Sequence, residues 1–411
     1  MKLQDRSTLT IGLELIESPS LANTDDSSGA ETYHAPPTIS EFRGTNTSSS
    51  AETQPRGRFV AGDAFFNYDA FGSLRADQDP VRLQDRGHFG LLVNAAAAGY
   101  CTTVFQYLFC PLLVEHLSIY HHGQTNSAKY LLQWPGAFSV FIGLSSDCFP
   151  LVGFRRKSYM LLGWSIALIM FASVAIVFGA TPATAAANGY LFLIFSILAA
   201  LGLQIAWVAS LAMTVEFAQR EHLYQRGHLQ SLYLLVQYIA IALTMVLCSV
   251  LLETHDDGVT MTSHVDLGGA TLLIVGGCLA AVPFVAFYLL EDRSIQTSRA
   301  AVTRRVSDLW HFLQHKVVYN MLFFLVGIVF LNGAQHNTAT QALALWSGVP
   351  ASKTSTVNIV TAIAHLIAAI MWKAALVNYS WRRLAVVGVL FKTLVILTLT
   401  LTTSYAVVRE A

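Results

Sequence analysis

The sequence predicts an all-α integral membrane protein, built as a bundle of about nine apolar helices. Three observations lead to this fold class: the composition, nine long apolar runs, and the charges of the segments that connect them. Of the 411 residues, 54% are apolar and only 12% are charged, and the mean hydropathy is +0.50. Soluble domains carry about 25% charged residues, so a soluble fold of this length would lack the polar surface that its core requires.

The N-terminal segment differs from everything that follows it. Residues 1–85 are rich in Ser, Thr, Asp, Gly and Pro and show no periodic apolar pattern. Such a segment cannot bury enough apolar surface to offset its ordering entropy, so we expect a disordered tail. Its first twenty residues hold no sustained apolar stretch, and no secretory signal is expected.

Nine apolar runs follow the tail, each close to the ~20 residues that a bilayer requires. They are continuously apolar and do not alternate, which favours helices over the strands of a barrel. The runs are Gly90–Leu113, Leu131–Leu151, Ser158–Gly179, Tyr190–Met213, Ser231–Leu252, Gly268–Leu290, Val317–Asn332, Thr354–Trp372 and Leu384–Tyr405.

The basic residues of the connections predict the orientation. If the tail is cytoplasmic, the second, fourth, sixth and eighth connections are cytoplasmic as well. These carry thirteen Lys and Arg residues, against two (Lys129 and Lys353) on the opposite side: Arg155, Arg156, Lys157, Arg220, Arg226, Arg293, Arg299, Arg304, Arg305, Lys316, Lys373, Arg382 and Arg383. This is the asymmetry of the positive-inside rule, and we expect a multi-pass protein, in the plasma membrane, with a cytoplasmic N-terminus.

The length of the connections predicts two unequal halves. Residues 86–290 would hold six helices, and residues 291–316 form an unusually long cytoplasmic connection. Residues 317–411 would then hold only three helices of a second half. We therefore expect a bundle that is three helices short of a symmetric plan of two six-helix halves.

Enzyme chemistry has little support in the sequence. The five cysteines (Cys101, Cys110, Cys148, Cys248 and Cys278) fall in or beside apolar runs without CxxC spacing, as expected of buried small hydrophobic residues. His116, His121 and His122 share a polar loop with Glu115 but do not form a closed ligand set, and no nucleophile, zinc or phosphate motif occurs at a usable position. A net charge of zero disfavours a nucleic-acid partner, because phosphate binding needs a basic excess. We expect no catalytic residues, no metal and no cofactor; the expected partners are the lipid bilayer and a small solute.

The most informative motif joins the second and third runs. Gly143-Leu-Ser-Ser-Asp147 is followed by Gly153-Phe-Arg155-Arg156-Lys157. Gly143 would let two helices approach closely, and Asp147 would lie at a helix end beside a basic turn. The carboxylate can pair with an arginine, and the pair can break when two halves rock. The alternative is a basic membrane anchor with an acid nearby by chance.

This segment resembles the same connection in major facilitator transporters, and a wider set of residues is similar to the folate–biopterin transporter family within that superfamily. The set comprises Trp134-Pro135, Phe141 to Pro150, Gly153 to Tyr159, Gly163-Trp164, Val215 to Glu221 with Arg226, Gly227 and Gln230, Asn94, Gly99, Leu345 to Val349, and Trp381-Arg382. The last two stretches resemble forms common in oomycete members. The resemblance covers about residues 90 to 383 and implies a major-facilitator-type bundle, with Gly143, Asp147, Gly153, Arg155, Arg156, Glu216 and Arg220 as gating or motif residues.

The chain departs from the family where charged groups would face the central cavity. The family has a lysine at Ser139, two aspartates at Trp207 and Leu211, and an arginine at Gln237. Two cations and two anions are lost together, so no buried charge is left without its partner. The cavity would nevertheless lack the groups that recognise an anionic solute such as a folate.

Several polar residues remain inside the apolar runs. Asn94, Gln204, Gln237, His365 and Lys392 are candidates for lining a cavity, with an interhelical hydrogen bond as the alternative for each. His365 could titrate near neutral pH. Lys392 lies about 13 Å along a helix from Arg383 at ~1.5 Å per residue, so it should face protein, water or a carboxylate.

Two functions from different classes follow. The first is a transporter of the folate–biopterin type that moves a small organic solute by alternating access. The second is a divergent or shortened paralogue that folds in the membrane but transports nothing, for example as a partner subunit. The lost charges and the short second half favour the second function, whereas the order of the motifs favours the first.

Overall fold

The structure is a computed structural model that describes residues 80–120, 128, 131–180, 189–222, 227–254, 261–263, 265–291, 299–334, 351–376 and 381–410. Most of the predicted tail lies outside these residues. Its last part, from residue 80, forms turns, and Leu83 is buried in the core of the helices that follow.

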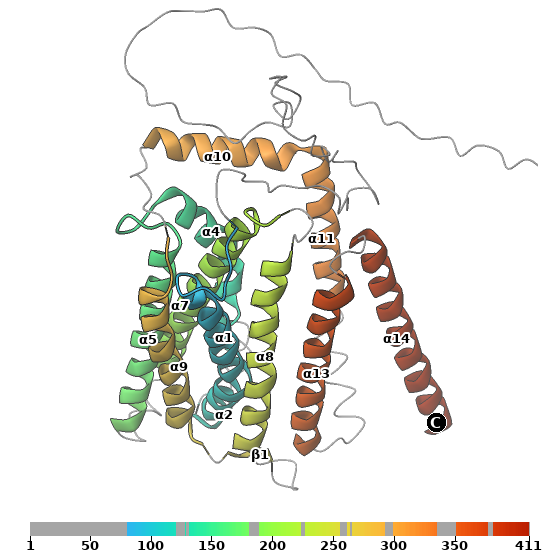
Figure 1. The fold of residues 1–411 in the computed structure, drawn as a ribbon. Helices are drawn as coiled ribbons and strands as arrows, with labels where there is room; N and C mark the ends of the chain where they lie inside the picture. The colour runs from blue at the N-terminus through green and yellow to red at the C-terminus, as the bar shows by residue number, and fades with distance from the viewer. Residues whose placement is uncertain are drawn as a thin grey trace, which may run out of the picture. The chain divides into compact units, whose positions relative to one another are not determined.

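The described elements are almost entirely helical (Figure 1). Two short strands, β1 (Leu252–Thr254) and β2 (Met261–Ser263), pair antiparallel with Leu252 opposite Ser263. The helices are α1 (Phe89–Val104), η2 (Phe105–Phe109), α2 (Cys110–Tyr120), η3 (Trp134–Phe138), α4 (Ser139–Cys148), α5 (Lys157–Ala180), α7 (Gly189–Ala218), α8 (His228–Leu251), α9 (Leu267–Phe287), α10 (Arg299–Gln314), α11 (Lys316–Ala334), α13 (Ala351–Met371), η5 (Trp372–Leu376) and α14 (Trp381–Glu410).

Among the described residues, six helices are long and apolar enough to cross a membrane, and a bent pair would make a seventh. The six are 89–114, 157–177, 189–218, 228–251, 267–287 and 356–376. The bent pair joins residues 306–314 of α10 to 316–330 of α11 at 81°. The all-helical membrane fold is confirmed, whereas the count of nine is not.

The second predicted run, Leu131–Leu151, is not one long helix. It contains the 3₁₀ helix η3 and the ten-residue helix α4. Pro135 lies in the first turn of η3; it carries no N–H to donate and restricts the residue before it. Ten α-helical residues extend only about 15 Å, half of a ~30 Å hydrocarbon layer. Apolar length alone therefore overstated the regularity of this segment.

The first span also changes its winding. Between α1 and α2, residues Phe105–Phe109 form a π-helix. This wider turn ends two residues before Pro111, whose missing N–H removes one hydrogen bond of the regular helix. The three segments together still form one membrane-length helix over residues 89–114.

The core lies among α1, α5, α7, α8 and α9. Helix α5 packs on α7 and α9, and α1 packs on α8 and α9. Phe105 and Phe109 of the first span stack at 5.5 Å, and both meet the ring of Phe171 edge-on at 5.8 and 5.6 Å. Four of the five cysteines are buried and Cys110 is half-buried, all as free thiols, which agrees with the role predicted for them.

The crossing of α5 and α7 depends on two glycines. A Cβ at Gly163 would lie 2.5 Å from the Ala206 nitrogen, and one at Gly202 would lie 2.6 Å from the Ala167 nitrogen. Because both obstacles are backbone atoms, a larger residue would push the helices apart. Small residues of this kind set helix–helix approach in membranes.

The helices after residue 298 are packed differently. A small cluster of Ala242 and Met245 on α8 with Ala362 on α13 connects them to the first part. The described large apolar side chains of α11 and α14 are mostly exposed, for example Phe323 at 72% and Phe391 at 68%. Exposed apolar surface of this extent fits an integral membrane protein, in which lipid covers it.

Candidate functional site

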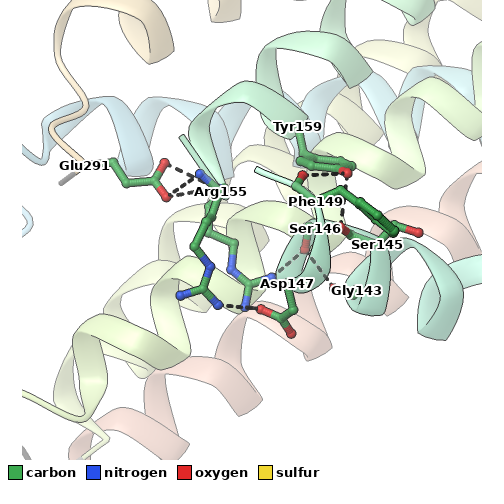
Figure 2. A network of polar contacts seen from close by, with 9 residues as sticks. Gly143, Ser145, Ser146, Asp147, Phe149, Arg155, Tyr159 and Glu291 are labelled. Carbon is green, nitrogen blue, oxygen red and sulfur yellow. Dashed lines mark hydrogen bonds and ion pairs between the residues drawn. The ribbon is translucent and has the colours of Figure 1, made fainter. Parts of the chain in front are cut away.

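The predicted motif between α4 and α5 forms a polar network (Figure 2). Asp147 lies near the C-terminal end of α4, and its Oδ1 accepts hydrogen bonds from Arg155 Nη2 at 2.9 Å and from Arg156 Nη2. Arg156 also donates to the Ser146 hydroxyl through Nη1. The Ser146 hydroxyl in turn donates to the Gly143 carbonyl at 2.8 Å. One carboxylate therefore holds two arginines eight and nine residues further along the chain.

A carboxylate from a distant helix holds the same turn. Glu291, four residues after α9, accepts from the backbone N–H groups of Arg155 at 3.0 Å, Arg156 at 2.9 Å and Lys157 at 2.7 Å. These are amides at the N-terminus of α5, which have no partner within their own helix. The negative charge also complements the positive end of the helix dipole. The Lys157 ammonium donates to the Leu289 carbonyl at 2.8 Å. This is a second contact between the start of α5 and the residues that follow α9.

The two arginines differ in burial. The Arg155 side chain is 29% exposed, whereas that of Arg156 is 9% exposed. Burial lowers the pKa of the Arg156 guanidinium and Arg155 acts in the same direction, while Asp147, Glu216 and Glu291 raise it. Glu216, on α7, therefore belongs to the electrostatic surroundings of this site, and α4, α5, α7 and the end of α9 all contribute to it.

The turn between α4 and α5 is narrow. Leu151 and Phe154 exchange backbone hydrogen bonds, both at 3.0 Å. The two residues between them have positive φ, 55° at Val152 and 80° at Gly153. Glycine adopts this conformation at little cost, whereas a β-branched residue rarely does. The Tyr159 hydroxyl lies 3.1 Å from the carbonyls of Ser145 and Phe149, so α5 also holds the end of α4.

Two other predicted motif residues, Arg220 and Gly143, make contacts of a different kind. The Arg220 guanidinium lies 5.2 Å from the centre of the Phe217 ring. A Cβ at Gly143 would meet only Val208 Cγ1 at 3.9 Å, an ordinary contact. The predicted close helix approach at Gly143 is therefore wrong, and the tight crossing lies at Gly163 and Gly202.

Three of the residues predicted as possible cavity lining lie between packed helices. Asn94 on α1 is fully buried, and its Oδ1 accepts from Trp164 Nε1 on α5 at 2.7 Å. Gln204 on α7 donates to the Ser139 hydroxyl at 2.8 Å. Gln237 on α8 lies at the close crossing with α1, where its backbone oxygen would be 2.7 Å from a Cβ at Gly99. For Asn94 these contacts favour the interhelical hydrogen bond over the cavity.

The other two candidates lie in the second part of the chain. The His365 ring on α13 is parallel to the Tyr238 ring on α8, with the centres 6.2 Å apart. Lys392 lies on α14 and is exposed. Within the described part of the chain, no group of three His, Cys, Asp or Glu side chains is arranged to hold a metal.

Sequence reasoning missed two capping carboxylates. Glu291 is the first acidic residue after the sixth apolar run, and this position at a helix end could have suggested a capping role. Glu221 accepts from the backbone N–H groups of Gly227 at 2.9 Å and of Leu229, at the start of α8. The short spacing between Glu221 and this helix start was a usable signal.

Comparison with known proteins gives one family. The model of a family described as BT1 matches residues 99–404. No curated protein and no solved structure matches the chain. The matched range covers α4, α5, α7 and the end of α9, and so includes every residue of the polar network.

Proposed function

The chain belongs to the BT1 family of folate–biopterin membrane transporters, and on that premise we propose that it moves a small organic solute by alternating access. The solute would bind between the two helical parts, as in transporters whose halves rock about a central site. Because the positions of Ser139, Trp207, Leu211 and Gln237 hold no charge, we propose a pterin-like or related solute less charged than a folate.

One observation carries this proposal: Asp147, Arg155, Arg156 and Glu291 join the ends of α4, α5 and α9 at one turn. We propose that this network is a reversible latch. The Asp147–Arg155 pair is partly exposed, and pairs reached by water contribute only about 0–1 kcal/mol. Such a pair can open and close during transport. The buried Arg156, with Glu216 nearby, would stay in place and guide reclosure.

The proposal extends to the layout of the chain in the membrane. The tail of residues 1–85 and the connection of residues 291–316 would lie in the cytoplasm. Residues 86–290 would form the first half, and residues 317–411 would belong to the second. The basic excess of the corresponding connections supports this orientation, and a plasma-membrane location is part of the same proposal.

Uptake into cells or vesicles tests the transport function. The protein, shown by surface labelling to be inserted, is supplied with pterins, folates or S-adenosylmethionine, and accumulation is measured against an empty membrane. We expect uptake of at least one solute. Replacing Asp147 with Asn should lower uptake about tenfold, the factor that corresponds to ~1.4 kcal/mol.

A matched aspartate serves as the control. Asp266 caps α9 by accepting from Gly269 N at 2.8 Å, and it takes no part in the network. Asp266→Asn should leave uptake within about twofold, a difference of ~0.4 kcal/mol. Equal losses for both variants would contradict the latch. No uptake of any solute by the inserted protein would instead support the non-transporting paralogue or partner subunit, which the uncharged Ser139–Gln204 contact favours.

A further inference from the structure

Helix α10 has one apolar and one polar side. Residues Val302, Val306, Leu309, Trp310 and Leu313 recur at helical spacing of three and four, so they share one face. Arg304, Asp308 and His311 fall on the opposite face at 100° per residue. The segment 299–316 carries Arg299, Arg304, Arg305 and Lys316 against Asp308, a net charge of 4 − 1 = +3.

Among the residues that the structure describes, the apolar face of α10 is left largely exposed. The side chains of Val306, Leu309 and Trp310 are 45%, 37% and 62% exposed. Among the described elements, α10 contacts α4 and α11. Three neighbouring apolar side chains, one of them a tryptophan, would be costly to leave in water, so this face needs an occupant.

The bend after α10 indicates what that occupant is. Helix α11 is apolar from Val317 onward, and the axis of α10 meets it at 81° beside His315 (Figure 1). If α11 runs along the membrane normal, α10 runs nearly parallel to the membrane surface. A helix of 16 residues with a polar side, an apolar side and a tryptophan, in a segment of net positive charge, is typical of segments that lie in the headgroup region.

We propose that α10 is an amphipathic membrane-surface helix that binds anionic lipid. The stripe of Val306, Leu309, Trp310 and Leu313 enters the boundary between headgroups and acyl chains. The cationic excess of residues 299–316 binds phosphatidylserine or phosphoinositide headgroups. The inference concerns the connection between the two parts of the chain and does not depend on which solute is transported.

Spin labelling of the full chain in nanodiscs tests the position of the stripe. In a background without the five native cysteines, a nitroxide is attached at Leu309→Cys or, on the opposite face, at His311→Cys. We expect the label at 309 to be accessible to oxygen and shielded from a water-soluble nickel complex, and the label at 311 to show the reverse. Equal nickel access at both positions would overturn the proposal, and so would a label at 309 shielded from both reagents, which indicates a protein contact.

Amide hydrogen exchange on the unmodified chain tests the lipid preference without any substitution in the core. Protection of peptides from residues 299–314 is compared in nanodiscs of phosphatidylcholine alone and with 30% phosphatidylserine. We expect at least about tenfold slower exchange with phosphatidylserine, and loss of the difference at high salt, since screening weakens surface charge interactions. The same exchange in both lipids would overturn the role of anionic lipid.

A pair of charge variants completes the test. The double variant Arg304→Gln/Arg305→Gln should remove most of the phosphatidylserine effect on these peptides. The double variant Arg382→Gln/Arg383→Gln removes the same charge at the start of α14 and should leave the effect intact. If both variants act alike, the response reports total charge and not binding by α10. Because the readout is local exchange, a failed uptake assay would not affect this result.

Discussion

The apolar helices before residue 291 and those after residue 298 differ in how they are packed. In the first part, Trp164, Phe171 and Phe192 are fully buried. In the second, Ala362 is the only buried residue among those whose side chains the structure describes. The difference teaches that apolar length predicts insertion into lipid, whereas packing between helices requires small residues and polar contacts at specific positions.

The largest expected effect tests this contrast with two glycines. Gly202→Ala places a Cβ 2.6 Å from the Ala167 nitrogen, whereas a Cβ at Gly327 of α11 would have nothing within 4 Å. Because backbone cannot yield as a flexible side chain does, Gly202→Ala should lower the free energy of unfolding by about 1–3 kcal/mol or more. Unfolding in mixed detergent micelles measures it. Gly327→Ala should be neutral or slightly stabilising. Similar losses of stability for the two variants would contradict the difference in helix packing between the first and second parts of the chain.

A buried polar contact is the next test. Asn94→Leu leaves the Trp164 indole N–H without its acceptor at a fully buried site. The expected loss of stability is about 1–2 kcal/mol, since an unsatisfied buried donor keeps its full desolvation cost. The control is Thr361→Val on α13, where the hydroxyl bonds only the Val357 carbonyl of its own helix. The same unfolding assay should find little change there; a larger loss at 361 than at 94 would contradict the comparison.

The cap of α5 should have a smaller effect. Glu291→Gln removes the negative charge that faces three amides at the start of α5. We expect a loss of about 0.5–1 kcal/mol in the same assay, the usual contribution of a charge at a helix N-terminus. Asp308→Asn, an exposed acid on α10, is the matched control and should change stability by less. An unchanged unfolding curve for Glu291→Gln would show that the three amides find other acceptors.

The smallest expected effect concerns pH. Burial raises the pKa of the Glu221 carboxyl above its ordinary value of 4.5. Hydrogen bonds from the backbone N–H groups of Leu229 and Gly227 lower the pKa, but burial has the larger effect. The folded chain therefore keeps this proton to higher pH than the unfolded chain does. The resulting stabilisation is complete below pH 4.5 and is lost as the pH rises through the raised folded pKa.

Unfolding measured over this pH window separates Glu221 from other acids. Glu221→Gln should flatten the dependence of stability on pH just above 4.5, the ordinary value. The unmodified chain, measured in parallel, gives the reference slope. If stability instead rises with pH in this window and Glu221→Gln abolishes the rise, the direction assigned to this pKa is wrong.

Much of the fold could be predicted from the sequence, because a bilayer selects continuous apolar runs. Eight of the nine predicted runs lie on long helices, and the exception contains Pro135. The search for continuous apolar runs does not find the amphipathic α10, because its apolar residues are periodic and lie within the predicted connection. The length of an apolar run therefore does not show whether a segment forms one regular helix, as the run with Pro135 does not, or whether a connection contains an amphipathic helix such as α10.

The site was predicted in part. Asp147, Arg155 and Arg156 are neighbours in the sequence, and their spacing was enough to suggest that they pair. Glu291 is 136 residues from Arg155, and Glu216 reaches Arg156 from α7; both depend on how α5, α7 and α9 pack. The close approach predicted at Gly143 is found at Gly163 and Gly202, because the sequence shows small residues without showing what they face.

The narrow turn at Val152 offers a labelling position for testing whether the proposed latch opens and closes. The Val152 side chain is 91% exposed, and it lies between the aspartate and the arginines of the network without bonding either. A dye attached there after replacement by cysteine would move with the turn while leaving Asp147 and Arg155 untouched. Its fluorescence could then record opening and closing in single molecules, before any solute has been identified.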